Sequence, residues 1–391
     1  MTGRALMALG LGQCVNWGVL YYAFAALMGP MASELRATPW VVTGAFSVAL
    51  LVAALAAPIV GQWSDRGNAP WLMQTGGLAA TLLTAASALV SNVFHLYAIW
   101  GVLGFCMAST LYEPAFAIVG RRHTDAAARL RALALVTILG GLASTIFLPL
   151  TGWLNAEIGW RRTLVVLAAM LGASTWLTRQ VAPLDMEQRT PEAPRTCGQA
   201  AAVARVVVPR SLLLTFAFVS LAGTAIMANL VAALGERGFT ASAAATIGGL
   251  LGVMQLPGRA LLLHAGADIS PSALLGVSLS LQAAGLLTWA LVPSSTAVVL
   301  GLSLFAMGAG LSTLIRPLVV QSQFGVDDAG RLNGRVARAQ QLARAAGPVG
   351  AGMLASLAGH RPVLVVLGVV FVALAWVSHS RVNIPSPAMN L

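Results

Sequence analysis

The chain has 391 residues, of which 58% are hydrophobic and 9% charged, and its formal net charge is +11. Soluble domains carry about 25% charged residues, so this composition excludes a water-soluble globular protein of this size. It predicts a polytopic α-helical membrane protein, because a bilayer requires long apolar segments whose backbone hydrogen bonds close internally. The arginines gather in short loops without a nucleic-acid-binding motif, so we predict no nucleic-acid partner.

Twelve apolar runs of about 20 residues, the length that crosses a bilayer, follow one another along the chain. The first six predicted spans are 5–31, 40–62, 70–90, 93–120, 132–155 and 161–181. The first run is longer than the core of a signal peptide, so we expect it to remain as a membrane helix. A polar segment rich in proline and charge then predicts a linker. Six more spans are predicted at 211–234, 241–264, 271–292, 296–320, 336–358 and 361–380.

The distribution of arginine predicts the orientation of these spans. With twelve spans both termini share one side, and 17 of the 23 basic residues fall on that side against five on the other. Cytoplasmic loops carry the excess of positive residues, so we expect both termini and the linker in the cytoplasm.

A hexapeptide recurs at an offset of 203 residues, as STLYEP at 109–114 and STLIRP at 312–317. The same offset carries Asp65 onto Asp268, and GWRR at 159 pairs with GHRP at 359. We therefore predict two pseudo-symmetric six-helix bundles of the same orientation, related by an axis along the membrane normal. The N-terminal bundle is expected over 1–182, the cytoplasmic linker over 183–210 and the C-terminal bundle over 211–391.

The turn after the second span reads Gly61-Gln-Trp-Ser-Asp65-Arg66-Gly67. It is similar to the Gly-x-x-x-Asp-Arg loop motif of the major facilitator superfamily of secondary transporters, which the chain resembles over nearly its whole length. EIGWRR, after the fifth span, and RLNGRVARAQQLARAAGPVGAG, leading into the eleventh, resemble segments of the monocarboxylate and oxalate/formate branch and its bacterial relatives. The resemblance implies the major facilitator fold, with twelve transmembrane helices.

Three departures from the superfamily pattern bear on function. Gly67-Asn68-Ala69-Pro70 stands where a second glycine and a basic run are expected, and Trp100 stands near the place where many proton-coupled members carry an arginine. The glycine-proline pattern of fifth-span antiporter motifs is reduced to Pro149-Leu-Thr-Gly152. The last two weaken an assignment to proton-coupled drug antiport.

Glu113 and Arg316 are ionisable residues inside predicted spans, where each costs about 2.5 to 3.5 kcal/mol to insert. The resemblance implies that both lie on helices around a central cavity. Three interpretations remain open: a salt bridge that only closes the cavity, Arg316 as the anchor of an anionic substrate with Glu113 holding it when the site is empty, and Glu113 as a proton carrier. The last two are compatible.

Other polar residues are predicted to line the same cavity, although each has a structural alternative. The aromatic candidates are Tyr21, Tyr22 and Tyr112, and such residues often only pack or lie at the membrane interface. Asn229 and Arg344 complete the set. Arg344 would make the cavity net positive, or else extend toward the cytoplasmic surface.

Two further groups are assigned mechanical roles. The resemblance implies a cytoplasmic gate in which Asp65, Arg66 and Asp268 take part, with arginines or helix N-termini across the bundle interface as partners. Pro114 and Pro317 follow the paired charges and predict helix hinges, or else irregular packing, because a proline removes a backbone hydrogen bond within a helix.

The leading hypothesis is a secondary transporter that moves a small organic anion such as a monocarboxylate by alternating access, with a proton as coupling ion. The alternatives are efflux of an amphiphilic drug or an arsenical, and, more remotely, a non-transporting membrane sensor or an intramembrane enzyme. No catalytic motif, cofactor or metal site is predicted. We expect a monomer in the lipid bilayer of a bacterial cytoplasmic (inner) membrane.

Overall fold

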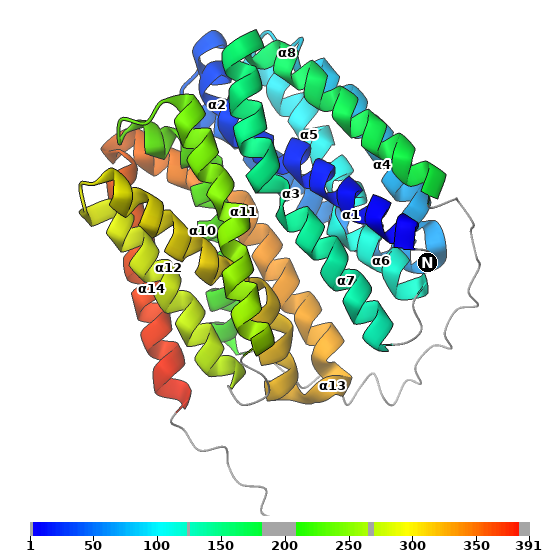
Figure 1. The fold of residues 1–391 in the computed structure, drawn as a ribbon, viewed down its shortest axis with the longest axis vertical. Helices are drawn as coiled ribbons and strands as arrows, with labels where there is room; N and C mark the ends of the chain where they lie inside the picture. The colour runs from blue at the N-terminus through cyan, green and yellow to red at the C-terminus, as the bar shows by residue number, and fades with distance from the viewer. Residues whose placement is uncertain (1–2, 123–125, 182–208, 265–269, 383–391) are drawn as a thin grey trace, which may run out of the picture.

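The computed structural model describes residues 3–122, 126–181, 209–264 and 270–382, which are almost entirely helical and include no β-strand. The first half of the chain forms α1 (Gly3–Trp17), the π-helix η1 (Gly18–Tyr22), α2 (Ala23–Glu34), α3 (Pro39–Trp63), the π-helix η2 (Ser64–Asn68), α4 (Ala69–Ser87), α5 (Val93–Thr110), α6 (Tyr112–Arg122), α7 (Ala126–Gly141) and α8 (Ala143–Val181). The second half forms α10 (Arg210–Gly235), α11 (Ala241–His264), α12 (Pro271–Leu291), α13 (Ser295–Ala358) and α14 (His360–Val382). Figure 1 shows these two sets as neighbouring bundles.

Each of the twelve predicted spans coincides with helical residues, but the boundaries between helices differ from the predicted boundaries between spans. Among the described residues, seven helical runs are long and apolar enough to cross a bilayer: 39–63, 93–122, 131–179, 210–235, 271–291, 295–312 and 360–378. The third of these covers the fifth and sixth predicted spans. The first predicted span is absent from the seven because the π-helix η1 divides it into shorter helices.

Most helix boundaries follow from residues that start or stop helices. Proline occupies the first turn of α3, α4 and α12, where its missing N–H costs no hydrogen bond. Asn92, Ser270 and Ser294 cap α5, α12 and α13 by accepting a hydrogen bond from a backbone N–H three residues later. These local signals explain why the predicted boundaries lie close to the observed ones.

The helix α13 contains both the tenth and the eleventh predicted spans. A straight helix of its length would extend about 96 Å, roughly three times the thickness of the hydrocarbon core. However, the Arg316 guanidinium donates to Gln340 Oε1 at 2.5 Å, although 24 residues of straight helix would separate the two by about 36 Å. The helix therefore folds back, and its two arms lie side by side.

Each bundle is tied at the end opposite the termini by a similar corner of hydrogen bonds. In the first, Arg161 donates to Glu34 at 2.9 Å and to the carbonyls of Ala88 and Val90 after α4. In the second, Glu236 accepts from the backbone N–H of His360 at 2.9 Å. Here Arg237 donates to the carbonyls of Trp289 and Ala290 at the end of α12.

The backbone confirms the pairing of GWRR with GHRP. Gly159 has φ 76° and ψ 161°, and Gly359 has φ 79° and ψ 171°. This left-handed, extended conformation strongly favours glycine. Gly159 interrupts α8 between its two helical segments, and Gly359 separates α13 from α14. The two halves therefore share the local geometry expected of duplicated halves.

We predict that Arg161→Leu lowers the melting temperature more than Glu34→Gln, because only the arginine also holds the carbonyls after α4. The hydrogen bonds from Arg161 and then Trp160 lower the pKa of Glu34. Because the pKa of Glu34 is lower in the folded state than in the unfolded state, its ionised carboxylate stabilises the fold at pH values above the usual glutamate pKa. This stabilisation disappears as the pH falls through the pKa of the folded state. Melting curves of the wild type and Glu34→Gln should therefore differ at neutral pH and converge in acid; a constant difference would contradict this account.

The two bundles meet through α3 with α13, α8 with α11, and α2 with α10. Ser47 of α3 accepts a hydrogen bond from the backbone N–H of Val349 at 3.1 Å. Gly249 and Gly252 let α11 approach α8 closely, because a Cβ at either position would press against atoms of α8. Ser47, Val349 and Gly249 lie in the halves of their helices that are farther from the termini.

Candidate functional site

The helix that carries Glu113 is broken. α5 ends at Thr110, Leu111 is extended with ψ −158°, and α6 begins at Tyr112. Pro114 explains the break, because it has no N–H to donate to the carbonyl of Thr110, four residues earlier, and its ring crowds that carbonyl. The break therefore leaves the Thr110 carbonyl without its helical partner inside the membrane.

Two amides of α1 supply the missing hydrogen bonds. Gln13 Nε2 donates to the Thr110 carbonyl at 2.8 Å, and Asn16 Nδ2 donates to it at 3.1 Å. Gln13 and Asn16 are both buried. We call Gln13, Asn16 and the Thr110 carbonyl the amide clamp. It ties α1 to the break from which Glu113 projects.

The tyrosines predicted to line a cavity belong to an aromatic cluster built on η1. Tyr21 contacts Trp17, Tyr22 and Phe46 with ring centroids 5.1 to 5.3 Å apart, and Trp17 also contacts Tyr112 at 5.0 Å. π-Helical turns often mark functional sites, because the wider turn displaces the side chains around it. The π-helix thus brings together residues from the first, second and fourth spans.

Trp100 packs in the hydrophobic core of the first bundle. It is 5% exposed and packs edge-to-face against Phe24 and Phe46. The place where the resemblance leads one to expect an arginine is therefore occupied by a buried aromatic side chain in the first bundle.

Arg316 is held within the second bundle by a chain of hydrogen bonds. It donates to Gln340, and Gln340 Nε2 donates to Ser220 Oγ of α10 at 3.0 Å. The Arg316 Nε is buried, with no hydrogen-bond partner in the described part of the molecule. One edge of the guanidinium is thus anchored, whereas its buried Nε lacks a hydrogen-bond partner among the described residues.

Arg316 lies within electrostatic range of both Arg344 and Glu113, and Tyr21 of the first bundle lies within range of Arg344 of the second. Among the described side chains, no ion pair within 4.0 Å joins Glu113 to either arginine. The group therefore carries two positive charges and one negative charge across the boundary between the bundles.

The N-terminus of α6 stabilises the Glu113 carboxylate. Glu113 is exposed and lies in the first turn of α6, where the positive end of the helix dipole favours a carboxylate. This gives its position a structural reason in addition to the three roles considered from the sequence.

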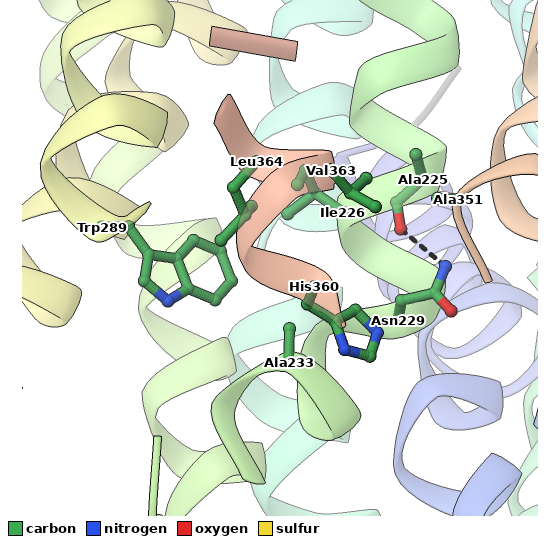
Figure 2. A pocket seen from close by; sticks show the side chains of 9 residues that line it. All are labelled: Ala225, Ile226, Asn229, Ala233, Trp289, Ala351, His360, Val363 and Leu364. Carbon is green, nitrogen blue, oxygen red and sulfur yellow. Dashed lines mark hydrogen bonds between the residues drawn. The ribbon is translucent and has the colours of Figure 1, made fainter. Parts of the chain in front are cut away.

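Asn229 lines the pocket in Figure 2. Its amide donates to the carbonyls of Ala225 and Pro348 at 3.0 and 3.2 Å, which ties α10 to α13. The pocket between Asn229, Trp289 and His360 has a volume of about 10 Å³, which is room for at most one water molecule. Asn229 thus has a packing role, and this pocket is too small for an organic solute.

The structure describes only some of the residues predicted to form the gate and the hinges. Arg66 is exposed on the turn after α3, whereas the side chains of Asp65 and Pro317, and the whole of Asp268, lie outside the described residues. The backbone at 317 is helical, so the break at Leu111 has no counterpart there. Gly67, with φ 95°, lies against the guanidinium of Arg121 from the same bundle.

Sequence reasoning overlooked Gln13 and Ser220, which hold the two charged stretches in place. Gln13 and Asn16 are polar residues three apart in an apolar run, so they share one face of a helix. That pattern, read with the proline in STLYEP, was the available signal for the amide clamp. Ser220 carries no comparable signal.

Comparisons with known proteins agree with the fold. A family model described as Major Facilitator Superfamily matches residues 9–348. The chain is 25% identical to monocarboxylate transporter 13 of Rattus norvegicus over 163 residues, 42% of this chain and 36% of that protein. It is 27% identical to human monocarboxylate transporter 11 over 192 residues, 49% of this chain and 39% of that protein. The matches thus span well under half the length of these relatives.

Solved structures resemble this one over nearly their whole length. A bacterial homologue of the human lysosomal transporter Spinster, in an inward-facing and unoccupied conformation, gives a TM-score of 0.76 at 17% identity, covering 99% of this chain and 100% of that one. The human organic anion transporter MFSD10 gives 0.69 at 18% identity, covering 97% and 100%. At these identities the likeness concerns the fold.

Proposed function

The chain belongs to the major facilitator superfamily, and from this membership we propose that it is a secondary transporter of a small organic anion, with a monocarboxylate as the first candidate. It is a multi-pass membrane protein of a transporter family. The observation that carries the choice of substrate is Arg316, a guanidinium fixed on one edge and unsatisfied at Nε. A planar guanidinium suits a carboxylate, and Arg344 nearby makes the region net positive.

The names of similar proteins support this choice. The curated relatives are named monocarboxylate transporters, and one structural neighbour is named an organic anion transporter. The aromatic cluster beside Arg344 offers an apolar surface for the rest of such a molecule.

We infer that the described conformation faces the cytoplasm. The contacts between bundles through Ser47 and Gly249 lie away from the termini, and the arginine distribution predicts that the termini lie in the cytoplasm. Rocking of the two bundles would then expose the same residues to either side, with Glu113 at the break of its helix. The remaining proposals are a monomer in a bacterial cytoplasmic membrane, the gate formed by Asp65, Arg66 and Asp268, and hinges at Pro114 and Pro317.

Counterflow in proteoliposomes tests the proposal. Vesicles loaded with an unlabelled monocarboxylate should transiently accumulate the labelled compound, whereas a neutral amide analogue should not exchange. Exchange of the amide at the same rate would overturn the assignment of an anionic substrate.

We propose that Glu113 carries the coupling proton, because it is exposed at the helix break and lies within electrostatic range of Arg316. The variant Glu113→Gln should lose acid-stimulated uptake while it retains counterflow, which needs no net proton movement. Initial rates measured with an acidic exterior and at symmetric pH separate the two. Unchanged acid stimulation in the variant would contradict the proton role.

Efflux of an amphiphilic compound is the second candidate, and the aromatic cluster around Tyr21 favours it. Deletion of the gene would then sensitise cells to members of a toxic-compound panel, including arsenicals. An uptake carrier for carboxylates should give no such sensitivity.

A further inference from the structure

A hollow opens where α3 turns into α4. It has a volume of about 410 Å³ and is lined by Trp63, Arg66, Asn68 and Trp71. Trp63 ends α3 and Trp71 lies in the first turn of α4, with their rings 6.2 Å apart. The turn between them reverses the chain through Gly67 at φ 95°.

The polar groups of the hollow are not used within the described part of the protein. Arg66 is exposed and makes no hydrogen bond or ion pair there. Asn68 precedes α4 but does not cap it with its side chain. The N-terminus of α4 adds partial positive charge. The hollow therefore presents an unpaired cation and an amide to an anionic ligand.

Apolar side chains lead away from the hollow on both helices. Leu51, Leu55, Ile59 and Trp63 recur every four residues on α3 and are 39% to 63% exposed. On α4, Trp71, Leu78 and Leu82 are 45% to 72% exposed. In a membrane protein such stripes face the acyl chains, and tryptophan marks the level of the headgroups. The hollow thus lies where two lipid-facing stripes reach the interface.

We propose that this hollow binds the headgroup of an anionic phospholipid. Arg66 and the Asn68 amide hold the phosphate, the two indoles flank the headgroup, and the acyl chains lie along the exposed stripes of α3 and α4. The predicted orientation places this end of the molecule at the cytoplasmic leaflet, where anionic lipids attract basic residues.

Native mass spectrometry of the full chain in detergent tests the proposal with dioleoyl phosphatidylglycerol and dioleoyl phosphatidylcholine. The wild type should bind the first phosphatidylglycerol more tightly than phosphatidylcholine. Arg66→Gln should weaken phosphatidylglycerol binding about fivefold and leave phosphatidylcholine nearly unchanged. Arg122→Gln, which removes an exposed cation at the same end of the bundle, should not.

Several outcomes would overturn the proposal. If the Arg66 and Arg122 variants lost the same affinity for phosphatidylglycerol, the lipid would be attracted diffusely rather than bound at a site. If the dissociation constant of phosphatidylglycerol were unchanged in Arg66→Gln, Arg66 would not bind the headgroup. Competition by millimolar inorganic phosphate would indicate a site for free anions. If Arg66→Gln does not purify as a single species, Trp63→Leu with Trp71→Leu should weaken binding while Arg66→Lys retains it; the opposite pattern would also overturn the proposal.

Discussion

Replacing Arg316 with leucine is expected to reduce carboxylate uptake by about 10- to 150-fold, the equivalent of losing a hydrogen bond to a charged group worth about 1.5 to 3 kcal/mol. The loss has two parts. The substrate loses the positive charge that binds it. Gln340 loses the Arg316 donor and is then held only by its hydrogen bond to Ser220 of α10. Initial uptake rates over a range of substrate concentrations provide the measurement.

Two variants separate the anchor from a purely structural role. Arg316→Lys retains the charge but lacks the planar fork, so it should recover part of the activity with a raised KM. Arg338→Gln removes an exposed cation from the same helix and should transport normally. If Arg316→Leu transported a carboxylate at the wild-type rate, Arg316 would not be the anchor.

Disabling the amide clamp is expected to lower both the melting temperature and the transport rate, and to do so non-additively. Gln13→Met or Asn16→Leu alone leaves the Thr110 carbonyl with one donor, so each single change should cost little. The double variant leaves a buried carbonyl unpaired, a loss of about 1 to 3 kcal/mol in the free energy of unfolding. Thermal unfolding of the four proteins in the same detergent gives the coupling between the two residues.

Pro114→Ala provides a matched control for this interpretation. Alanine restores the backbone N–H that proline lacks, and this N–H can donate to the Thr110 carbonyl. In this background the double variant at Gln13 and Asn16 should destabilise the protein less. Equal destabilisation in both backgrounds would mean that the amides act elsewhere.

The sequence predicted the place and pairing of the helical spans because these depend on signals it carries directly. Apolar runs of bilayer length gave the spans, and the 203-residue offset gave the two halves. Proline and glycine mark many helix ends, as at Gly159 and Gly359. The resemblance to a known transporter superfamily carried the same information independently.

What escaped prediction depends on contacts between distant segments. The π-helix at 18–22 contains no residue that specifies it, since it forms where Gly18 packs against Phe147. The hydrogen bond from Asn229 to the carbonyl of Pro348 joins two segments that are distant in sequence, and the place of Asn229 in the cavity stays a prediction. The amide clamp required knowing that α1 lies beside the break at Leu111.

The opposite charges in STLYEP and STLIRP have different surroundings despite the similarity of the two hexapeptides. Glu113 follows a helix break and is exposed, whereas Arg316 lies in a helix that continues and is bonded to Gln340. Duplication predicts the shared residues, and divergence at this position produces an asymmetric pair of helices. This asymmetry is the physical basis for assigning substrate to one half and proton to the other.

A structure of the protein with a bound monocarboxylate tests the central claim most directly. The account predicts ligand density between the two bundles, with a carboxylate oxygen within about 3 Å of a nitrogen of the Arg316 guanidinium. Density that occupies another part of the molecule, with Arg316 still bonded to Gln340 and untouched by ligand, would contradict it.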